Sequence, residues 1–192
     1  MDITERIKAA DSLLSTFPKE AMGDGVKEET PKRVAKMWNE LLAGYDQDPG
    51  EILNKKFNVD AGGDTNANGI VVVKDIPFYS CCEHHLVPFY GTVSIAYIPK
   101  NSVVGLSKFA RLVECYARRL QVQERLTKQI IDDINKYLGP LGAMVVITAE
   151  HMCMTMRGIQ KPGTKTVTSR VYGVFFDKPE ARAEALSLIE GK

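Results

Sequence analysis

The chain has 192 residues, of which 44% are hydrophobic and 26% are charged, and its formal net charge at pH 7 is +1. This composition is typical of a soluble globular protein long enough to bury a sizeable core without disulfides or a metal. The near-neutral charge excludes a general nucleic-acid-binding surface, and no apolar run approaches the ~20 residues of a membrane span. Any anion that the protein binds must therefore meet a local cluster of cations.

The cysteines and histidines point to a metal site. There are four cysteines, and they are Cys81, Cys82, Cys115 and Cys153. All three histidines lie within three residues of a cysteine, and they are His84, His85 and His151. The N-terminal segment MDITERIKAADSLLS lacks the apolar core of a signal peptide, so we expect a cytoplasmic protein. In that compartment cysteines bind metals or stay buried as thiols more often than they form disulfides.

Residues 1–50 have a helical pattern. A first helix is predicted from apolar residues at steps of three and four, which are Ile3, Ile7, Ala10 and Leu14. A second helix is predicted to begin with Thr30 as its N-cap and Pro31 at its first position, and to end at Gly44. The apolar stripe of this helix is Val34, Met37, Trp38, Leu41 and Leu42.

A loop is predicted over residues 58–69, because the sequence NVDAGGDTNANG is rich in Gly, Asn and Asp. We expect this loop to separate an N-terminal helical arm, residues 1–57, from a main body, residues 58–192. The two parts are expected to act as one functional unit.

After the loop the pattern changes to strands. Short β-prone runs cover residues 70–73 and 76–79, and residues 92–98 alternate as a half-buried strand does. Two helices follow, over residues 107–120 and through residue 138, the first with a buried stripe of Phe109, Val113, Tyr116 and Leu120. Strands over residues 143–149 and 166–176 precede a short C-terminal helix. This order predicts an α+β fold, with an antiparallel sheet and two consecutive helices on one face.

The metal site is predicted from two segments. In the first, SCCEHHLVP, Cys82 and His85 have the Cys-x-x-His spacing at which one turn of backbone brings thiolate and imidazole to one ion. In the second, EHMCM, His151 and Cys153 are two residues apart at a strand end and are expected on one face. Mixed thiolate and imidazole ligands suit zinc. Buried thiols and core histidines are the alternative, which the presence of both segments disfavours.

The fourth coordination position separates a structural from a catalytic zinc. Cys81, Cys82, His85 and Cys153 would close a structural Cys₃His site. Adjacent side chains on an extended chain point apart, however, so Cys81 and Cys82 are an unfavourable pair of ligands. Three ligands with one open position fit better. His84 and His151 are then left near the metal as general acid or base candidates.

Four segments resemble the GTP cyclohydrolase I family, and they are CCEHHLVPFYG, AYIPKNSVVGLSKFARLVE, QVQERLTKQI and EHMCMTMRGIQKPGTKT. The resemblance runs in register from about residue 30 to residue 176. It implies a tunnel-type fold, with residues 58–192 as the catalytic domain. The family opens the imidazole ring of GTP with water, releases formate and forms 7,8-dihydroneopterin triphosphate, at the start of folate and other pterin biosynthesis.

The resemblance also implies roles for residues. Zinc is the expected cofactor, with Cys82, His85 and Cys153 as ligands and with proton transfer by His84 and His151. Glu124, with Gln123 beside it, is expected to bind guanine, whereas by position alone a Glu at a helix start is more often a dipole or capping residue. The expected triphosphate ligands are Ser107, Lys108, Arg111 and Arg157. The first three lie in one helical turn, where the alternative is a solvated basic face.

The resemblance further implies a ring-shaped homo-oligomer, expected to be a decamer, with active sites at subunit boundaries.

Two other functions compete with that of GTP cyclohydrolase I. A nitrile-reducing enzyme of queuosine synthesis would use a lone cysteine nucleophile and no Cys/His zinc set. A zinc-stabilised binding module would close its site with four protein ligands. Cys81 stands where the family more often has Met or Leu, so oxidation of the Cys81–Cys82 pair would remove a zinc ligand.

Overall fold

The computed structural model describes residues 2–18, 20, 22–58 and 69–191. The chain divides into two compact units, Met1–Ala43 and Gly44–Lys192. The N-terminal unit is a pair of helices, α1 (Ile3–Leu14) and α2 (Val26–Leu41), which pack on each other. Asp2 caps α1 by accepting a hydrogen bond from the backbone N–H of Thr4 at 2.8 Å. The two predicted helices of this region are therefore confirmed.

The start of the second helix differs from the prediction. α2 begins at Val26 with Gly25 as its N-cap, so Thr30 is not the cap and Pro31 lies inside the helix. A proline there gives up one helical hydrogen bond. Pro31 is buried, so its packing offsets that loss. On the predicted apolar stripe, Met37 is 44% exposed.

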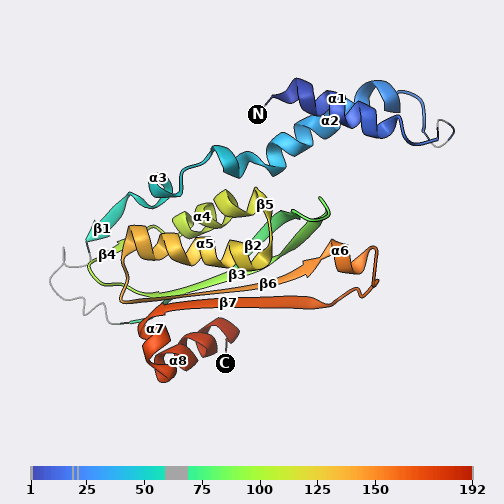
Figure 1. Cartoon of the computed structure of the whole chain (residues 1–192). Coiled ribbons are helices and arrows are strands. Elements are labelled where there is room, and N and C mark those ends of the chain that lie inside the picture. Colours follow the sequence, from blue (N-terminus) through green and yellow to red (C-terminus); the bar gives the residue numbers. More distant parts are fainter. Residues whose placement is uncertain (1, 19, 21, 59–68, 192) are drawn as a thin grey trace. The chain divides into compact units, whose positions relative to one another are not determined.

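The larger unit is built on a five-stranded sheet in the order β5-β2-β3-β6-β7 (Figure 1). These strands are β2 (Val71–Cys82), β3 (Pro88–Ile98), β5 (Leu120–Gln121), β6 (Gly142–His151) and β7 (Lys165–Gly173). A second, two-stranded sheet pairs β1 (Lys56–Asn58) with β4 (Ser102–Val104). The predicted loop over residues 58–69 lies, apart from its two end residues, outside the described part of the chain.

Helices connect and cover these strands. The longer ones are α4 (Ser107–Ala117), α5 (Gln123–Asp133) and α8 (Pro179–Glu190). The short ones are the 3₁₀-helix η2 (Ala43–Asp46), α3 (Pro49–Leu53), the π-helical turn η4 (Ile134–Leu138), α6 (Met152–Thr155) and α7 (Val174–Asp177). The α5–η4 segment ends at Gly139, whose φ of 60° is a left-handed conformation that glycine adopts without strain. Among the described residues, no helix is long and apolar enough to cross a membrane.

The sheet is antiparallel except at one edge. β2, β3, β6 and β7 pair antiparallel in that order, which confirms the predicted sheet. β5 pairs parallel with β2, through Leu120 opposite Cys81 and Gln121 opposite Cys82. Leu120 was expected on the buried stripe of a helix, but α4 ends at Ala117. The sheet thus gains a short edge strand beside the predicted metal-binding turn.

The two predicted strands over residues 70–79 are one strand. β2 runs through both and on to Cys82, with a register shift between Val73 and Ile76. Asp75, inside this bulge, has a φ of 59°, which is uncommon for a residue other than glycine. The extra residue keeps the strand in the sheet while it interrupts the hydrophobic pattern. The bulge therefore explains why the alternation of apolar residues over residues 70–79 predicted two short strands instead of one.

Both faces of the sheet are buried in its centre. Val93, Ile95 and Tyr97 of β3 pack in the core under α4 and α5, as the predicted helical layer requires. Ala96 and Ile98 point to the opposite face and pack in a second core with Phe175 of α7 and with α8. Figure 1 shows α7 and α8 on the side of the sheet away from α4 and α5. The strand over residues 92–98 was predicted to be half-buried, and this prediction is wrong. The predicted strand over residues 166–176 is too long, because β7 ends at Gly173.

β3 approaches β6 closely at Gly91. A Cβ atom at this position would lie 1.9 Å from the carbonyl oxygen of Thr148 and 2.7 Å from the Cα of Ala149. Both are backbone atoms, which no rotamer change moves. A glycine inside a strand at such a contact allows the two backbones to approach.

Replacing this glycine is expected to destabilise the fold. Gly91→Ala should lower the free energy of unfolding by about 1–3 kcal/mol or more, because the new methyl group overpacks the β3–β6 contact. Thermal unfolding at fixed protein concentration measures this as a Tm several degrees lower. Gly105→Ala is the matched control, since its Cβ would meet nothing within 4 Å. Equal Tm values for the two variants would contradict the described packing of β3 against β6.

Candidate functional site

A tight turn at the end of β2 forms the first half of the site. The backbone N–H of Leu86 donates to the carbonyl of Cys82 at 2.8 Å, and the N–H of Cys82 donates to the carbonyl of Val87 at 2.9 Å. Leu86 has a φ of 55°, which reverses the chain into β3. The turn places His85 Nδ1 3.7 Å from Cys82 Sγ. The predicted Cys-x-x-His geometry is therefore present.

Cys153 completes the group from the end of β6. β6 ends at His151, and Cys153 lies in the helical turn α6, so the same-face argument for His151 and Cys153 does not apply. The helical turn brings Cys153 to the first half instead. The ligand atoms of Cys82, His85 and Cys153 all lie within 4.8 Å of one another.

The donor set fits a zinc ion. Ligand atoms around a tetrahedral zinc with bonds of about 2.0–2.3 Å are roughly 3.5–4 Å apart. The 3.7 Å between Cys82 Sγ and His85 Nδ1 agrees with this spacing, and the whole group lies within 4.8 Å. Burial, and then the neighbouring Cys82 thiol, raise the pKa of Cys153 above its ordinary value. Two adjacent thiolates repel each other, and a cation between them removes that penalty. The Cys82, His85 and Cys153 group thus has the geometry and the chemistry of a zinc site with three protein ligands.

Cys81 is not part of this group of described residues. It is 4% exposed and pairs with Pro88 of β3 and Leu120 of β5. Burial, with a contribution from Cys82, raises the pKa of Cys81 to about 11. Cys81 is therefore a buried, protonated thiol beside the ligand turn.

His151 lies next to the metal group at the end of β6. Its ring stacks on Phe89 at a centroid distance of 4.7 Å and an interplanar angle of 3°. Its Nε2 lies 2.8 Å from Oε1 of Gln123. Burial lowers the pKa of His151, while the negative charge of Glu124 raises it by a smaller amount. These effects favour the neutral ring.

The start of α5 contributes two predicted residues with different environments. Glu124 is exposed in the first turn, where a carboxylate is available to a ligand. Gln123 is only 1% exposed, and its amide bonds to protein groups rather than facing solvent.

His84 is the exposed histidine of the turn. Its side chain is 64% exposed, with Nε2 3.9 Å from a carboxylate oxygen of Glu83 and Nδ1 4.0 Å from Cys82 Sγ. Glu83 also bonds to the guanidinium of Arg125, which holds the pKa of Glu83 below its usual value. The carboxylate therefore stays ionised beside His84.

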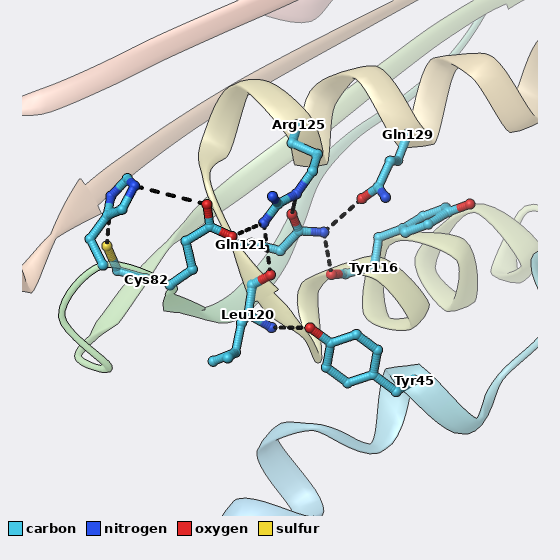
Figure 2. A network of polar contacts seen from close by, with 9 residues as sticks. Tyr45, Cys82, Tyr116, Leu120, Gln121, Arg125 and Gln129 are labelled. Atoms are coloured by element: carbon cyan, nitrogen blue, oxygen red, sulfur yellow. Dashed lines mark hydrogen bonds and ion pairs between the residues drawn. The ribbon is translucent and has the colours of Figure 1, made fainter.

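Arg125 is a site residue that sequence reasoning missed. Besides Glu83, it donates to the carbonyl of Leu120 at 2.9 Å and to Oε1 of Gln121 at 2.9 Å. Gln121 in turn donates to the carbonyl of Tyr116 and to Gln129, as Figure 2 shows. The only feature of the sequence that could have drawn attention to Arg125 is its place directly after Glu124. Its ion-pair partner Glu83 is 42 positions away, so the pair leaves no local pattern in the sequence.

The predicted triphosphate residues lie in two places. Arg157 is exposed and follows α6, close in sequence to Cys153. Ser107, Lys108 and Arg111 lie within the first five residues of α4, near the predicted start of this helix. The C-terminal end of α4 leads into β5, which pairs with the metal-binding strand. An 11-residue helix is about 16 Å long, and this cluster lies at the end of α4 opposite to the end that leads into β5.

The groove beside the α4 cluster is electrically mixed. Lys108 and Arg111 line it together with Asp46, Asp48 and Glu51. The acidic groups reduce the attraction of the two cations for an anion in this groove.

Comparison with known proteins agrees with the metal geometry. A sequence model of the family described as GTP cyclohydrolase I matches residues 7–190. The chain is 52% identical to GTP cyclohydrolase 1 of Carboxydothermus hydrogenoformans, over 94% of this chain and 91% of that protein. It is 50% identical to GTP cyclohydrolase 1 of Desulforamulus reducens, over 98% of this chain and 97% of that protein.

One solved structure has a lower similarity. The archaeosine synthase QueF-Like, in the apo form, matches with a TM-score of 0.47 and 18% identity, over 57% of this chain and 97% of that chain. The curated relatives are similar along nearly their whole length, and half of the aligned residues are identical. Because the family match spans almost the full sequence as well, this chain belongs to the GTP cyclohydrolase I family.

Proposed function

We propose that the protein hydrolyses the guanine imidazole ring of GTP to formate and 7,8-dihydroneopterin triphosphate, as a zinc-dependent GTP cyclohydrolase I. The observation that carries this proposal is the convergence of Cys82, His85 and Cys153 beside His151. The relatives described above support it, since they are named for this activity.

The protein's own residues have distinct roles in this reaction. Cys82, His85 and Cys153 would hold the zinc ion, which would lower the pKa of a water molecule to about 7 and so supply hydroxide near neutrality. His84 and His151 transfer protons, one of them to the imidazole nitrogen that leaves C8. His84 Nδ1 lies 4.0 Å from Cys82 Sγ and His151 precedes Cys153 by two residues, which supports these roles.

Guanine recognition is assigned to Glu124. One carboxylate accepts hydrogen bonds from both the ring N–H and the exocyclic amine of guanine, a pair that adenine does not offer. The exposure of Glu124 at the start of α5 supports this role. Gln123, its buried neighbour, was expected in the same subsite.

Triphosphate binding is assigned to Arg157 together with Ser107, Lys108 and Arg111. The cluster lies at the end of α4 opposite to the end that leads into β5, and α4 is about 16 Å long, which supports a role for the cluster in the site of another subunit. The protein is therefore proposed to be a homo-oligomer with shared sites, and a ring-shaped decamer is the arrangement expected for the family. The exposed edge strand β7 offers a surface for such assembly.

The cellular setting completes the proposal. Residues 58–192 act as the catalytic domain and residues 1–57 as a helical arm. The enzyme works in the cytoplasm, at the first step of folate or other pterin biosynthesis.

Incubation with GTP tests the activity directly. The zinc-loaded protein should release formate and one pterin per GTP, detected by fluorescence after oxidation. ATP should give no product, because Glu124 requires the guanine edge. A chelator should abolish turnover, and added zinc should restore it. Absence of formate from GTP at saturating zinc would overturn the proposal.

Zinc content separates ligands from proton-transfer residues. Cys153→Ala should lose both zinc and turnover, whereas His84→Ala should keep zinc and lose about 10²–10⁴-fold in kcat. Elemental analysis and kinetics measure the two effects. Cys81→Ala is the matched control, because its thiol is buried beside the ligand turn but outside the group, and it should keep its zinc. Loss of zinc from His84→Ala would contradict this assignment.

Mixed oligomers test the shared sites. Lys108→Ala and Cys153→Ala chains are each expected to be inactive, but co-expression should recover about a quarter of the wild-type activity, since one complete site forms where a chain of each kind meets. A mixture of His85→Ala and Cys153→Ala chains is the control, because both changes fall in the same metal group. The result that contradicts sharing is no recovery in the first mixture.

A further inference from the structure

The buried amide of Gln123 bonds to groups on two strands, β6 and β7. Its Nε2 donates to the carbonyl oxygens of Ile147 and Thr166, both at 3.0 Å, and lies 3.1 Å from Oγ1 of Thr168. Its Oε1 lies 2.8 Å from Nε2 of His151. An amide so completely engaged with protein groups, in a side chain that is 1% exposed, is not presented to a substrate.

The two carbonyl contacts determine which way round the amide lies. A backbone carbonyl only accepts hydrogen bonds, so the NH₂ group of Gln123 must face Ile147 and Thr166. Its oxygen must then face His151. A carbonyl oxygen also only accepts, so the hydrogen in the 2.8 Å contact belongs to His151 Nε2. The backbone of β6 and β7 thereby selects the tautomer of the histidine.

Other contacts keep both side chains in place. Phe89 stacks on the His151 ring almost in parallel, at 3° and 4.7 Å, which restricts its tilt. The hydroxyl of Thr127 donates to the carbonyl of Gln123 at 2.7 Å and also lies 2.7 Å from the hydroxyl of Thr168. The first turn of α5 is thus attached to β7 at the residue that contacts the histidine. With its tilt and one nitrogen held, the ring presents Nδ1 in a constant direction.

We infer that Gln123 is a positioning residue, which holds His151 as the Nε2–H tautomer and leaves Nδ1 to take up and return the proton of the reaction. This inference rests on the proposed function for the proton transfer, but the tautomer itself does not depend on it. Gln123 then contacts His151 and does not bind guanine, although it was expected to. Of the two neighbouring residues, only Glu124 would bind guanine. A wrong tautomer puts the lone pair on the wrong nitrogen and is costly in catalysis.

Solid-state NMR of the zinc-loaded full chain, labelled with ¹⁵N-histidine, tests the tautomer. The chain has only three histidines, and His151→Gln identifies the signals of His151 by their disappearance. The expected result at neutral pH is a protonated Nε2 and an unprotonated Nδ1. A protonated Nδ1 with an unprotonated Nε2 overturns the inference. This measurement stands whether or not GTP is the substrate.

Steady-state kinetics with GTP tests the consequence. Gln123→Met, similar in size but without the amide, should keep its zinc and lose about 10- to 100-fold in kcat, with KM for GTP little changed. Thr148→Val is the control, since Thr148 follows Ile147 on β6 but is not among the contacts of Gln123, and it should keep the wild-type kcat. A raised KM at unchanged kcat indicates contact with guanine instead and overturns the inference. If Gln123→Met fails to fold, the wild-type spectrum decides.

The two proposals fail in different ways. A wild-type protein that releases no formate from GTP contradicts the proposed function. A wild-type protein that turns over GTP with His151 in the Nδ1–H form contradicts only the role of Gln123.

Discussion

The guanidinium of Arg125 joins the metal-binding turn to the start of α5, and the rest of the site depends on this link. One side chain bonds to Glu83 in the turn, to the carbonyl of Leu120 and to the side chain of Gln121 (Figure 2). A guanidinium suits the task because its planar donors point in several directions at once. The parallel β2–β5 pairing holds the same two segments by backbone bonds. The turn that carries Cys82 and His85 is therefore fixed to the start of α5, where Glu124 lies.

Much of the metal site could be predicted from the sequence, because its ligands lie in short segments with tight spacing. Cys82 and His85 are three positions apart, and the turn between them is local. Cys153 was identified by residue type, but its position in a helical turn was not, since α6 is too short to leave a periodic pattern. The contact of Gln123 with His151 joins two segments whose pairing depends on the fold. Such contacts become visible only when the sheet is assembled.

The fold was predictable where one periodicity runs without interruption. α1 and α5 follow their patterns closely. The errors fall where tertiary packing overrides a local pattern. β3 was expected to be half-buried because its alternation reads Thr, Ser and Ala as polar or small, yet Ala96 faces a second core under α7 and α8. β5 has only two residues, so pairing with β2, rather than propensity, defines it as a strand.

The length of α4 has a consequence for how the activity depends on protein concentration. With sites shared between subunits, as proposed above, each chain carries two half-sites, which are the cationic cluster at the start of α4 and the metal group. Association then creates catalytic capacity as well as stability, so we expect activity per chain to fall when dilution separates subunits. A ligand or partner that binds near the subunit boundary would change the number of complete sites without touching any reacting group. Under this proposal, assembly is itself a means of control.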